Sequence, residues 1–288
     1  MLGELVHFRT EDGLELDGMF YSPKGRGRRA AISVHGFTGT FYENRDDFFA
    51  EGLTRAGWAF LTMNNRGHGH IADFTIRRNG RKSRLLAGAA FERFEDCIYD
   101  ILAAKRFLKR MGYSEFVLVG HSTGCQKIVY YQLTQRDRDV KALVLLAPVD
   151  DTAWQKRYLG DRFRAALRHA RELVRRGREK EWMPQWSFDG PISAGRYWRM
   201  FAPHSVEGRM FDYASGLPHL GELKLPIYAA FGDREEYAVM SPKKMLAVIK
   251  AAAGSSCETR LIRGADHGFN HRERALVRSV VAWLKNAI

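Results

Sequence analysis

FVLVGHSTGCQKIVYY, residues 116–131, joins an apolar strand to the start of a helix, with Ser122 between two glycines. The apolar run stops at Gly120, and apolar residues resume at helical spacing after Gly124. Because glycine has no Cβ, a strand and a helix can approach closely at these positions while the serine between them adopts a strained backbone. This arrangement predicts a nucleophile elbow, from which the Ser122 hydroxyl projects at the carboxyl end of a strand.

A nucleophilic serine needs a base that takes its proton and an acid that holds the base in the required tautomer. His267 follows the last predicted strand in RGADHGFN, and Asp233 ends the preceding strand in YAAFGDREE. The order Ser122, Asp233, His267 is the Ser–acid–His order of a hydrolase triad. Asp150 and Asp151 follow another buried strand and stay open as alternative acids.

Acyl transfer also requires amide donors directed at the negatively charged oxygen of the tetrahedral intermediate. The amide of Thr123, directly after the serine, is one expected donor. SVHGFTGT follows the first buried strand, so the amide of Phe37 is the expected second donor, with Thr38 as a lesser candidate. His35 in the same segment is expected to be a structural hydrogen-bonding residue.

Strands and helices alternate along most of the chain. LVHFRT and LELDGMFY flank a turn and predict an N-terminal hairpin, and a basic loop is expected over residues 77–84. Strands that are apolar on both faces and separated by helices predict an α/β fold whose mostly parallel sheet is covered on both sides. The predicted buried strands span 30–36, 58–65, 115–120, 141–149, 226–233 and 257–268, and the predicted helices span 43–56, 91–111, the segment after Ser122, 241–252 and a C-terminal segment to Lys285.

The alternation breaks between residues 150 and 218, where no strand is evident and four of the six tryptophans occur. We therefore expect residues 1–149 and 219–288 to form the core and residues 150–218 to form a helical cap. Trp154, Trp186 and Trp198, together with Thr38, are predicted to line an apolar or aromatic substrate pocket.

The formal net charge of +13 does not by itself indicate nucleic-acid binding. Basic residues concentrate at 77–84 and 168–180, but apolar residues at helical spacing place most arginines of the second stretch on an outer, solvated face. Nucleic acid is therefore not an expected partner, although attraction of an anionic ester stays open.

The N-terminal segment and the lengths of the apolar stretches predict a cytoplasmic protein without stable membrane insertion. MLGELVHFRT does not show a basic segment followed by an apolar one, as a signal peptide would, and no apolar stretch approaches the about 18 residues of a membrane span. The three cysteines, Cys97, Cys125 and Cys257, form no metal-binding pattern, so free thiols and no metal site are expected. A homodimer stays open.

HGFTG, NNRGHG, GHSTG, FGD and DHGF occur in an order that resembles the α/β-hydrolase superfamily of serine hydrolases over nearly the whole chain. NNRGHG and GHSTGCQK are similar to a subgroup related to fungal siderophore-ester hydrolases and bacterial esterases. Asn65 departs from that pattern, because many members have Asp before the residue that corresponds to Arg66.

This resemblance implies an α/β-hydrolase fold with a serine carboxylesterase activity that needs no cofactor. The expected substrate is a small-molecule ester with a small to medium or aromatic acyl group, hydrolysed through an acyl-enzyme. A thioesterase, a C–C bond hydrolase and a non-catalytic ligand-binding protein of the same fold stay open as alternatives.

Overall fold

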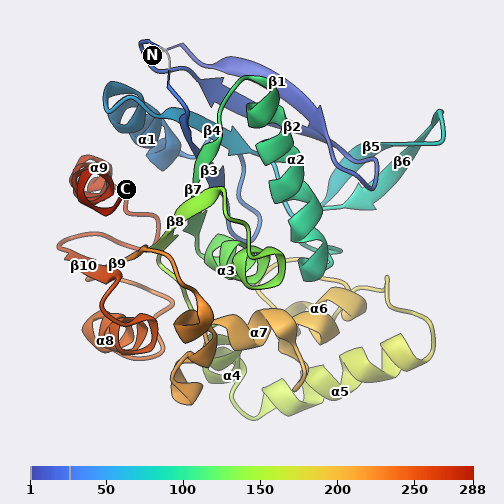
Figure 1. The fold of residues 1–288 in the computed structure, drawn as a ribbon. Coiled ribbons are helices and arrows are strands. Elements are labelled where there is room, and N and C mark those ends of the chain that lie inside the picture. The colour runs from blue at the N-terminus through green and yellow to red at the C-terminus, as the bar shows by residue number, and fades with distance from the viewer. Residues whose placement is uncertain (1, 26) are drawn as a thin grey trace.

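A computed structural model describes residues 2–25 and 27–288. Within this part of the chain the main sheet has eight strands in the order β1-β2-β4-β3-β7-β8-β9-β10 (Figure 1). The N-terminal strands β1 and β2 form the expected hairpin and pair antiparallel, β2 pairs antiparallel with β4, and all other neighbours are parallel. The strands are β1 (Glu4–Arg9), β2 (Glu15–Tyr21), β3 (Arg29–Val34), β4 (Ala59–Met63), β7 (Glu115–His121), β8 (Val140–Leu146), β9 (Ile227–Gly232) and β10 (Cys257–Ile262).

Helices cover both faces of the sheet, which confirms the predicted α/β class. The helices α1 (Asn44–Arg55) and α9 (Glu273–Ala287) pack against each other on one face (Figure 1). On the other face lie α2 (Cys97–Arg110), preceded by the short turn η1 (Phe94–Asp96), α3 (Thr123–Gln135) and α8 (Pro242–Ala253). The central strands are buried along most of their length, which is why they read as unbroken apolar runs.

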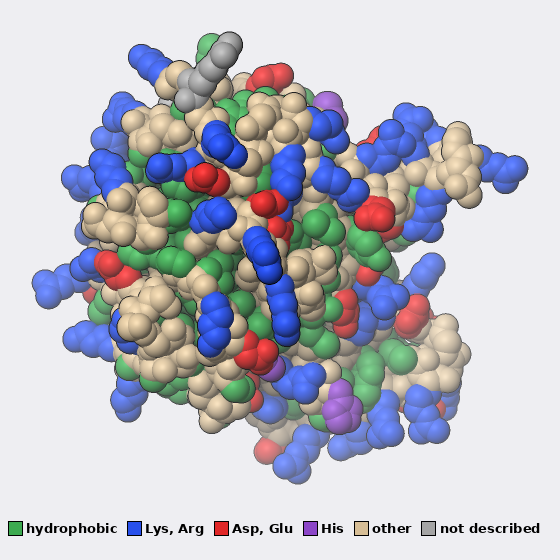
Figure 2. All heavy atoms as spheres, viewed as in Figure 1, with side chains coloured by type: hydrophobic (Ala, Val, Ile, Leu, Met, Phe, Trp, Pro, Cys, Tyr) green, Lys and Arg blue, Asp and Glu red, His purple; other side chains and the backbone are tan. Residues whose placement is uncertain are grey.

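Residues 77–84 do not form the expected basic loop. They belong to an antiparallel hairpin of β5 (Ala72–Arg78) and β6 (Arg81–Ala87). Asn79 and Gly80 connect the strands with φ angles of 51° and 75°. Two positive φ angles are the requirement of a type I′ turn, and Asn-Gly is the favoured pair for it. The hairpin extends away from the sheet with basic side chains exposed along it, and Arg84 pairs with Asp73 (Figure 2).

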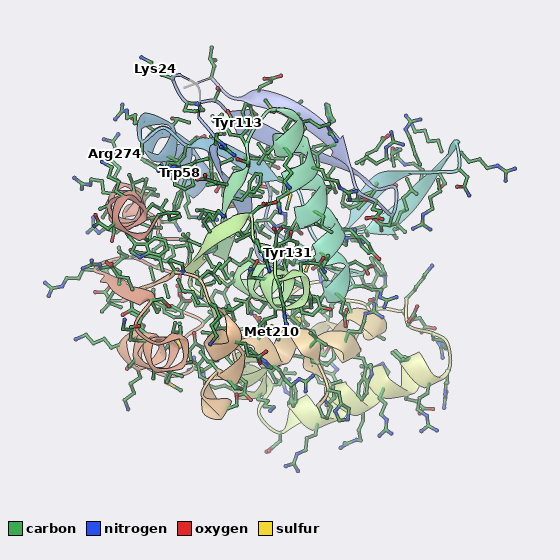
Figure 3. All side chains as sticks on the ribbon, viewed as in Figure 1. Lys24, Trp58, Tyr113, Tyr131, Met210 and Arg274 are labelled. Carbon is green, nitrogen blue, oxygen red and sulfur yellow. The ribbon has the colours of Figure 1, made fainter. Side chains whose placement is uncertain are left out.

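Residues between β8 and β9 form a mostly helical layer. Its elements are α4 (Asp151–Leu159), α5 (Arg162–Arg175), η2 (Gln185–Ser187), α6 (Ala194–Phe201), α7 (Val206–Met210), η3 (Tyr213–Ser215) and η4 (Pro218–Glu222). Buried side chains from α5 and α6, including Phe163, Ala166 and Tyr197, form a hydrophobic cluster separate from the main core. Met210 on α7 instead joins the main core, where α7 packs against α3, the helix that carries Tyr131 (Figure 3). The cap boundaries at 150 and 218 stay a prediction.

Charged side chains are dispersed over the molecular face shown in Figure 2, with acidic residues between basic ones. On α5 the buried positions Phe163, Ala166, Ala170 and Leu173 repeat at helical spacing, which leaves its arginines in solvent. None of the helices in residues 2–25 and 27–288 combines the length and apolarity needed to cross a bilayer.

At the connection from β7 to α3 the main-chain atoms pack so closely that two positions leave no room for a side chain. A Cβ on Gly124 would lie 2.0 Å from the carbonyl oxygen of Val34, and a Cβ on Gly120 would lie 2.6 Å from the carbonyl oxygen of Gly124. Both obstacles are backbone atoms, which cannot rotate away. The close approach of β3, β7 and α3 therefore depends on glycine at both positions.

We expect Gly124→Ala to lower the free energy of unfolding by at least about 3 kcal/mol, because the new methyl group must displace main-chain atoms. Gly57→Ala is the control, since its Cβ would meet nothing within 4 Å and its cost of about 1–2 kcal/mol comes from the positive φ angle alone. Urea unfolding of both variants measures the difference. Equal losses of stability would show that the elbow tolerates a side chain.

Candidate active site

Ser122 occupies the sharp turn between β7 and α3. Its φ and ψ angles are 54° and −128°, a conformation that L-residues adopt only when the surrounding structure enforces it. The Ser122 amide donates to the carbonyl of Leu146 at 2.9 Å, which fixes the turn to β8. A Cβ on Gly36 would lie 2.7 Å from the Ser122 Cβ, so the loop after β3 packs directly against the serine. Ser122 therefore lies at the strand–turn–helix junction that the predicted nucleophile elbow requires.

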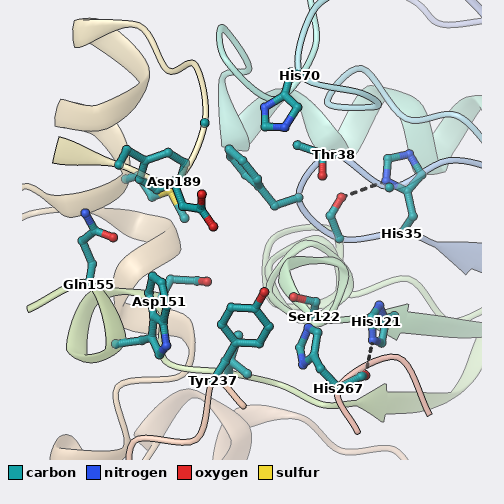
Figure 4. A pocket seen from close by; sticks show the side chains of 18 of the residues that line it. His35, Thr38, His70, His121, Ser122, Asp151, Gln155, Asp189, Tyr237 and His267 are labelled. Carbon is teal, nitrogen blue, oxygen red and sulfur yellow. Dashed lines mark hydrogen bonds between the residues drawn. The ribbon is translucent and has the colours of Figure 1, made fainter. Parts of the chain in front are cut away.

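Ser122 lines a cavity of about 490 Å³ between the sheet and the cap. His267, His121 and Tyr237 form part of the same wall, whereas Asp151 and Gln155 come from the cap side (Figure 4). This volume falls within the range of pockets that bind small molecules, about 300–1,000 Å³. Its larger apolar lining residues are Phe37, Trp154, Phe188, Met200, Phe201 and Tyr237.

The carboxylate that contacts His267 belongs to Glu235, and the expectation of Asp233 in this position is wrong. His267 Nδ1 lies 2.7 Å from Glu235 Oε1, and the Glu235 side chain is fully buried. Asp233 Oδ1 instead accepts the amide proton of Gly264 at 2.7 Å, which ties the end of β9 to the loop after β10. Glu235 lies two residues farther along, where the chain has turned toward the histidine. The sequence signal was the acidic pair that follows Asp233 and Arg234.

The neighbours of Glu235 also hold His267 in place. Glu236 Oε2 accepts the His267 amide proton at 2.8 Å, and the Tyr237 ring packs edge-on against the imidazole at a centroid distance of 4.7 Å. His121 Nε2 lies 2.8 Å from the His267 carbonyl oxygen (Figure 4). Burial holds the pKa of His121 well below its usual range, so this ring is neutral and donates the hydrogen bond.

The alternative acids occupy other positions. Asp150 caps α4 by accepting the Ala153 amide proton at 2.8 Å. Asp151 Oδ2 accepts from Gln126 Nε2 at 2.7 Å, and its carboxylate lies at the cap side of the cavity. Burial, followed by the nearby charge of Glu207, raises the pKa of Asp151 well above its usual range. Within the described part of the chain, neither carboxylate contacts His267.

The two predicted oxyanion amides lie in suitable elements. Thr123 is the first residue of α3, and Phe37 lies in the loop after β3 and lines the cavity. Among the described residues no protein acceptor takes either amide proton. Free amides beside the nucleophile, with the positive end of a helix dipole behind one of them, are what an oxyanion site requires.

His35 and Asn65 order the loop that carries Phe37. His35 Nδ1 lies 2.8 Å from the Gly36 carbonyl oxygen, and its Nε2 accepts the Asn65 amide proton at 3.1 Å. Burial places the pKa of His35 well below its usual range, which agrees with a neutral ring that donates from Nδ1. Asn65 Nδ2 in turn donates to the His35 carbonyl at 3.1 Å. These contacts agree with the structural role expected for His35.

Of the predicted pocket residues, the structure places Thr38 and Trp154 at the cavity. Trp186 and Trp198 do not line it, so their prediction is wrong. Trp186 is exposed at the outer surface beneath the Arg162 guanidinium, and Trp198 packs on the hydrophobic cluster of the cap. Phe188 and Phe201 supply the aromatic cap surface instead. Helical phase, which a tryptophan count does not reveal, decides which side chains face inward.

A buried chain of charges connects the nucleophile helix with the cap. Lys127 on α3 pairs with Glu92 at 2.6 Å, and the Arg196 guanidinium on α6 lies 3.7 Å from the same carboxylate. Arg196 also pairs with Glu207 on α7. Lys127 Nζ further donates to Asn65 Oδ1 at 3.1 Å, so the asparagine that departs from the family pattern is a member of this network.

Among the described residues, no cluster of three or more His, Cys, Asp or Glu side chains has the arrangement of a metal site. Ser122 and His267 line the same cavity, and His267 in turn contacts the buried Glu235 carboxylate. A family model described as the alpha/beta hydrolase fold matches residues 32–216.

The chain belongs to the α/β-hydrolase family.

Solved structures share this α/β-hydrolase fold over nearly the full chain. Est1E from Butyrivibrio proteoclasticus has 19% sequence identity and a TM-score of 0.68, with 98% of each chain covered. The siderophore hydrolase EstB from Aspergillus fumigatus has 19% identity and a TM-score of 0.73, with 100% of this chain and 98% of that chain covered. A thermostable carboxyl esterase from Bacillus coagulans has 14% identity and a TM-score of 0.69, with 100% and 99% covered. No curated protein sequence matches the chain.

The contact between His267 and Glu235 is open to a spectroscopic test. We expect the Nδ1 proton of His267 to resonate downfield, because it lies in a short hydrogen bond to a buried carboxylate. Glu235→Ala should abolish this resonance and Asp233→Asn should retain it, as measured by NMR on protein with labelled histidine. Loss in the Asp233 variant alone would reverse the assignment of the acid.

Proposed function

We propose that this α/β-hydrolase hydrolyses carboxylic esters with Ser122 as nucleophile, His267 as base and Glu235 as the acid that orients the base. The observation that carries the proposal is the convergence of a strained serine and a carboxylate-bound histidine on one cavity. Each feature is costly to maintain by itself, and together they match the requirements of nucleophilic acyl transfer.

In the first half-reaction the ester carbonyl lies beside Ser122 Oγ. Because Nδ1 of His267 faces Glu235, the proton resides on Nδ1 and leaves Nε2 free to accept the Ser122 proton. Oγ attacks the carbonyl carbon, and the amides of Phe37 and Thr123 bind the oxygen that becomes negative. The protonated His267 then donates its Nε2 proton to the departing alkoxide, which leaves the acyl group on Ser122.

In the second half-reaction a water molecule replaces the alcohol. His267 Nε2 takes a proton from this water, and the resulting hydroxide attacks the acyl carbonyl while the same amides bind the oxyanion. The tetrahedral intermediate collapses with transfer of the proton to Ser122 Oγ. The carboxylic acid is released, and the serine is regenerated.

The cavity favours esters of small to medium or aromatic acids. Phe37, Phe188 and Phe201 form an aromatic wall, with Tyr237 beside the histidine. The structural relatives support this choice, since one is described as Est1E with bound ferulic acid and another as a carboxyl esterase. Aromatic side chains contribute apolar contact area at little conformational cost, so an aromatic or short aliphatic acyl group fits this surface.

We expect Ser122→Ala to lower kcat for p-nitrophenyl butyrate by at least about 10⁴-fold, because no other group can form the acyl-enzyme. Ser215→Ala, at the end of a surface turn, is the matched control and should retain wild-type turnover. Initial rates of purified variants give the comparison. Equal turnover by Ser122→Ala and wild type would exclude this serine as the nucleophile.

The assignment of the acid generates a separate kinetic prediction. Glu235→Gln should lower kcat by about 10⁴-fold, because an amide no longer fixes the required tautomer of His267. Asp233→Asn should lower it by less than about 10-fold, since Oδ1 of asparagine still accepts the Gly264 amide proton. A larger loss from the Asp233 change than from the Glu235 change would contradict the proposed triad.

Assays of the wild-type protein with different substrates distinguish the open alternative functions. A thioesterase would hydrolyse acyl thioesters with a kcat/KM well above that of the matched oxygen esters, and a C–C hydrolase would cleave a vinylogous diketone that an esterase leaves intact. The proposal expects the highest kcat/KM for oxygen esters. A ligand-binding protein would bind esters without Ser122-dependent turnover.

A further inference from the structure

Arg45 is a buried cation at the wall of the active-site cavity. It lies in the first turn of α1, just after the loop that carries Phe37, and only 5% of the residue surface is exposed. Its side chain lines the same cavity as Ser122 and His121. No other arginine or lysine of the described chain lines this cavity.

The Arg45 guanidinium lacks a partner among the side chains and backbone that the structure describes. Among the described residues it forms no hydrogen bond, ion pair or stacking contact. The other buried basic residues in this part of the chain each pair with a carboxylate: Arg66 with Asp100, Lys105 with Asp137, Lys127 with Glu92 and Arg196 with Glu207. Burying an unpaired charge is costly, so this exception requires an explanation.

The nearby acids are engaged elsewhere. Asp46 accepts a hydrogen bond from Ser33 Oγ at 3.0 Å, and Glu43 accepts the Thr40 amide proton at 3.0 Å. Burial raises the pKa of Asp46 to about 6, although the charge of Arg45 opposes that rise. The other acids at the cavity, Asp151 and Asp189, come from the cap, and neither forms an ion pair with Arg45 in the described structure.

The guanidinium also remains accessible from the cavity. Some buried side-chain atoms of the described chain have neither a hydrogen-bond partner nor exposed surface, and a nitrogen of Arg196 and one of Arg199 are among them. No nitrogen of Arg45 belongs to this group. Arg45 therefore presents unpaired N–H donors to the space in which the substrate lies. A planar guanidinium binds a carboxylate through two parallel hydrogen bonds, and its burial strengthens such a pair.

From this geometry we infer that Arg45 binds a carboxylate carried by the ester substrate, separate from the ester that is cleaved. This inference rests on the proposed esterase function and narrows it to half-esters of dicarboxylic acids. The basic hairpin β5–β6 is not involved, because none of its residues lines the cavity. Selectivity for an anionic ester thus arises from one buried contact rather than from the surface charge.

The test compares matched methyl esters that differ in one terminal group. Monomethyl succinate, glutarate and adipate are paired with methyl butyrate, valerate and hexanoate, and kcat/KM is measured for each pair. We expect Arg45→Gln to lower the ratio of anionic to neutral kcat/KM by at least about 10-fold for the best pair. Arg55→Gln, an exposed position on the same helix, should leave every ratio unchanged.

Arg45→Lys keeps the charge but loses the two parallel hydrogen bonds, so it should lower the ratio less than Arg45→Gln does. It also provides a second variant if the glutamine change disturbs folding. An unchanged ratio in both folded variants would overturn the inference, and so would an equal loss for anionic and neutral esters.

A binding measurement keeps this inference separate from the proposed chemistry. In a Ser122→Ala background, calorimetric titration with glutarate and adipate should show binding that Arg45→Gln weakens at least about 10-fold. Inorganic phosphate serves as the competing anion, and tighter binding of phosphate than of the dicarboxylates would overturn the choice of a carboxylate. If Ser122→Ala hydrolyses esters like wild type, the proposed function fails, whereas this titration still decides whether Arg45 binds a carboxylate.

Discussion

The structure depends on a main-chain contact so close that it leaves no room for a side chain. At Gly124 the nucleophile helix lies so close to the end of β3 that an added Cβ would be 2.0 Å from the Val34 carbonyl oxygen. This contact brings three elements together: the strand that ends just before Ser122, the helix that begins at Thr123 and the loop that carries Phe37. The strained φ and ψ angles of Ser122 are a consequence of that packing. One steric constraint therefore positions Ser122 and the amides of Phe37 and Thr123, which we propose as nucleophile and oxyanion donors.

Buried polar contacts extend this constraint outward to the cap. His35 and Asn65 hold the loop after β3, and Lys127 joins Asn65 to the nucleophile helix. The Glu92 carboxylate then forms ion pairs with both Lys127 and, in the cap, Arg196. Removing one member of a buried ion pair leaves its partner desolvated, so such a network resists changes in relative position. The helices α6 and α7 are thus held to α3 by charge as well as by apolar packing.

The sequence predicted those parts of the molecule that follow from local pattern. Continuous apolar runs identified the buried strands, and the Gly-x-Ser-x-Gly junction identified Ser122, because both signals lie within a few adjacent residues. The Asn79-Gly80 pair carried an equally local signal for the β5–β6 hairpin, but the surrounding arginines and lysines suggested a loop. Strand and turn chemistry outweighs charge in such a segment.

Predictions failed where side-chain direction depends on tertiary structure. Asp233, Glu235 and Glu236 occupy one loop, and only the fold shows that Glu235 reaches the ring of His267 while Asp233 binds the Gly264 amide. The prediction for the cap tryptophans failed for the same reason, since the residues that face the cavity depend on how the helices are docked. Arg45 gave no signal in the sequence because its significance lies in the absence of a partner among the described residues.

In the proposed mechanism the elbow, the base and the buried acid together make Ser122 nucleophilic. Mass spectrometry after reaction with a fluorophosphonate tests it directly, because this reagent is attacked by an activated serine and remains bound. We expect a single adduct on the peptide that contains Ser122, formed far more slowly in His267→Ala and Glu235→Gln. An adduct on another residue, or equally fast labelling of all three proteins, would contradict it.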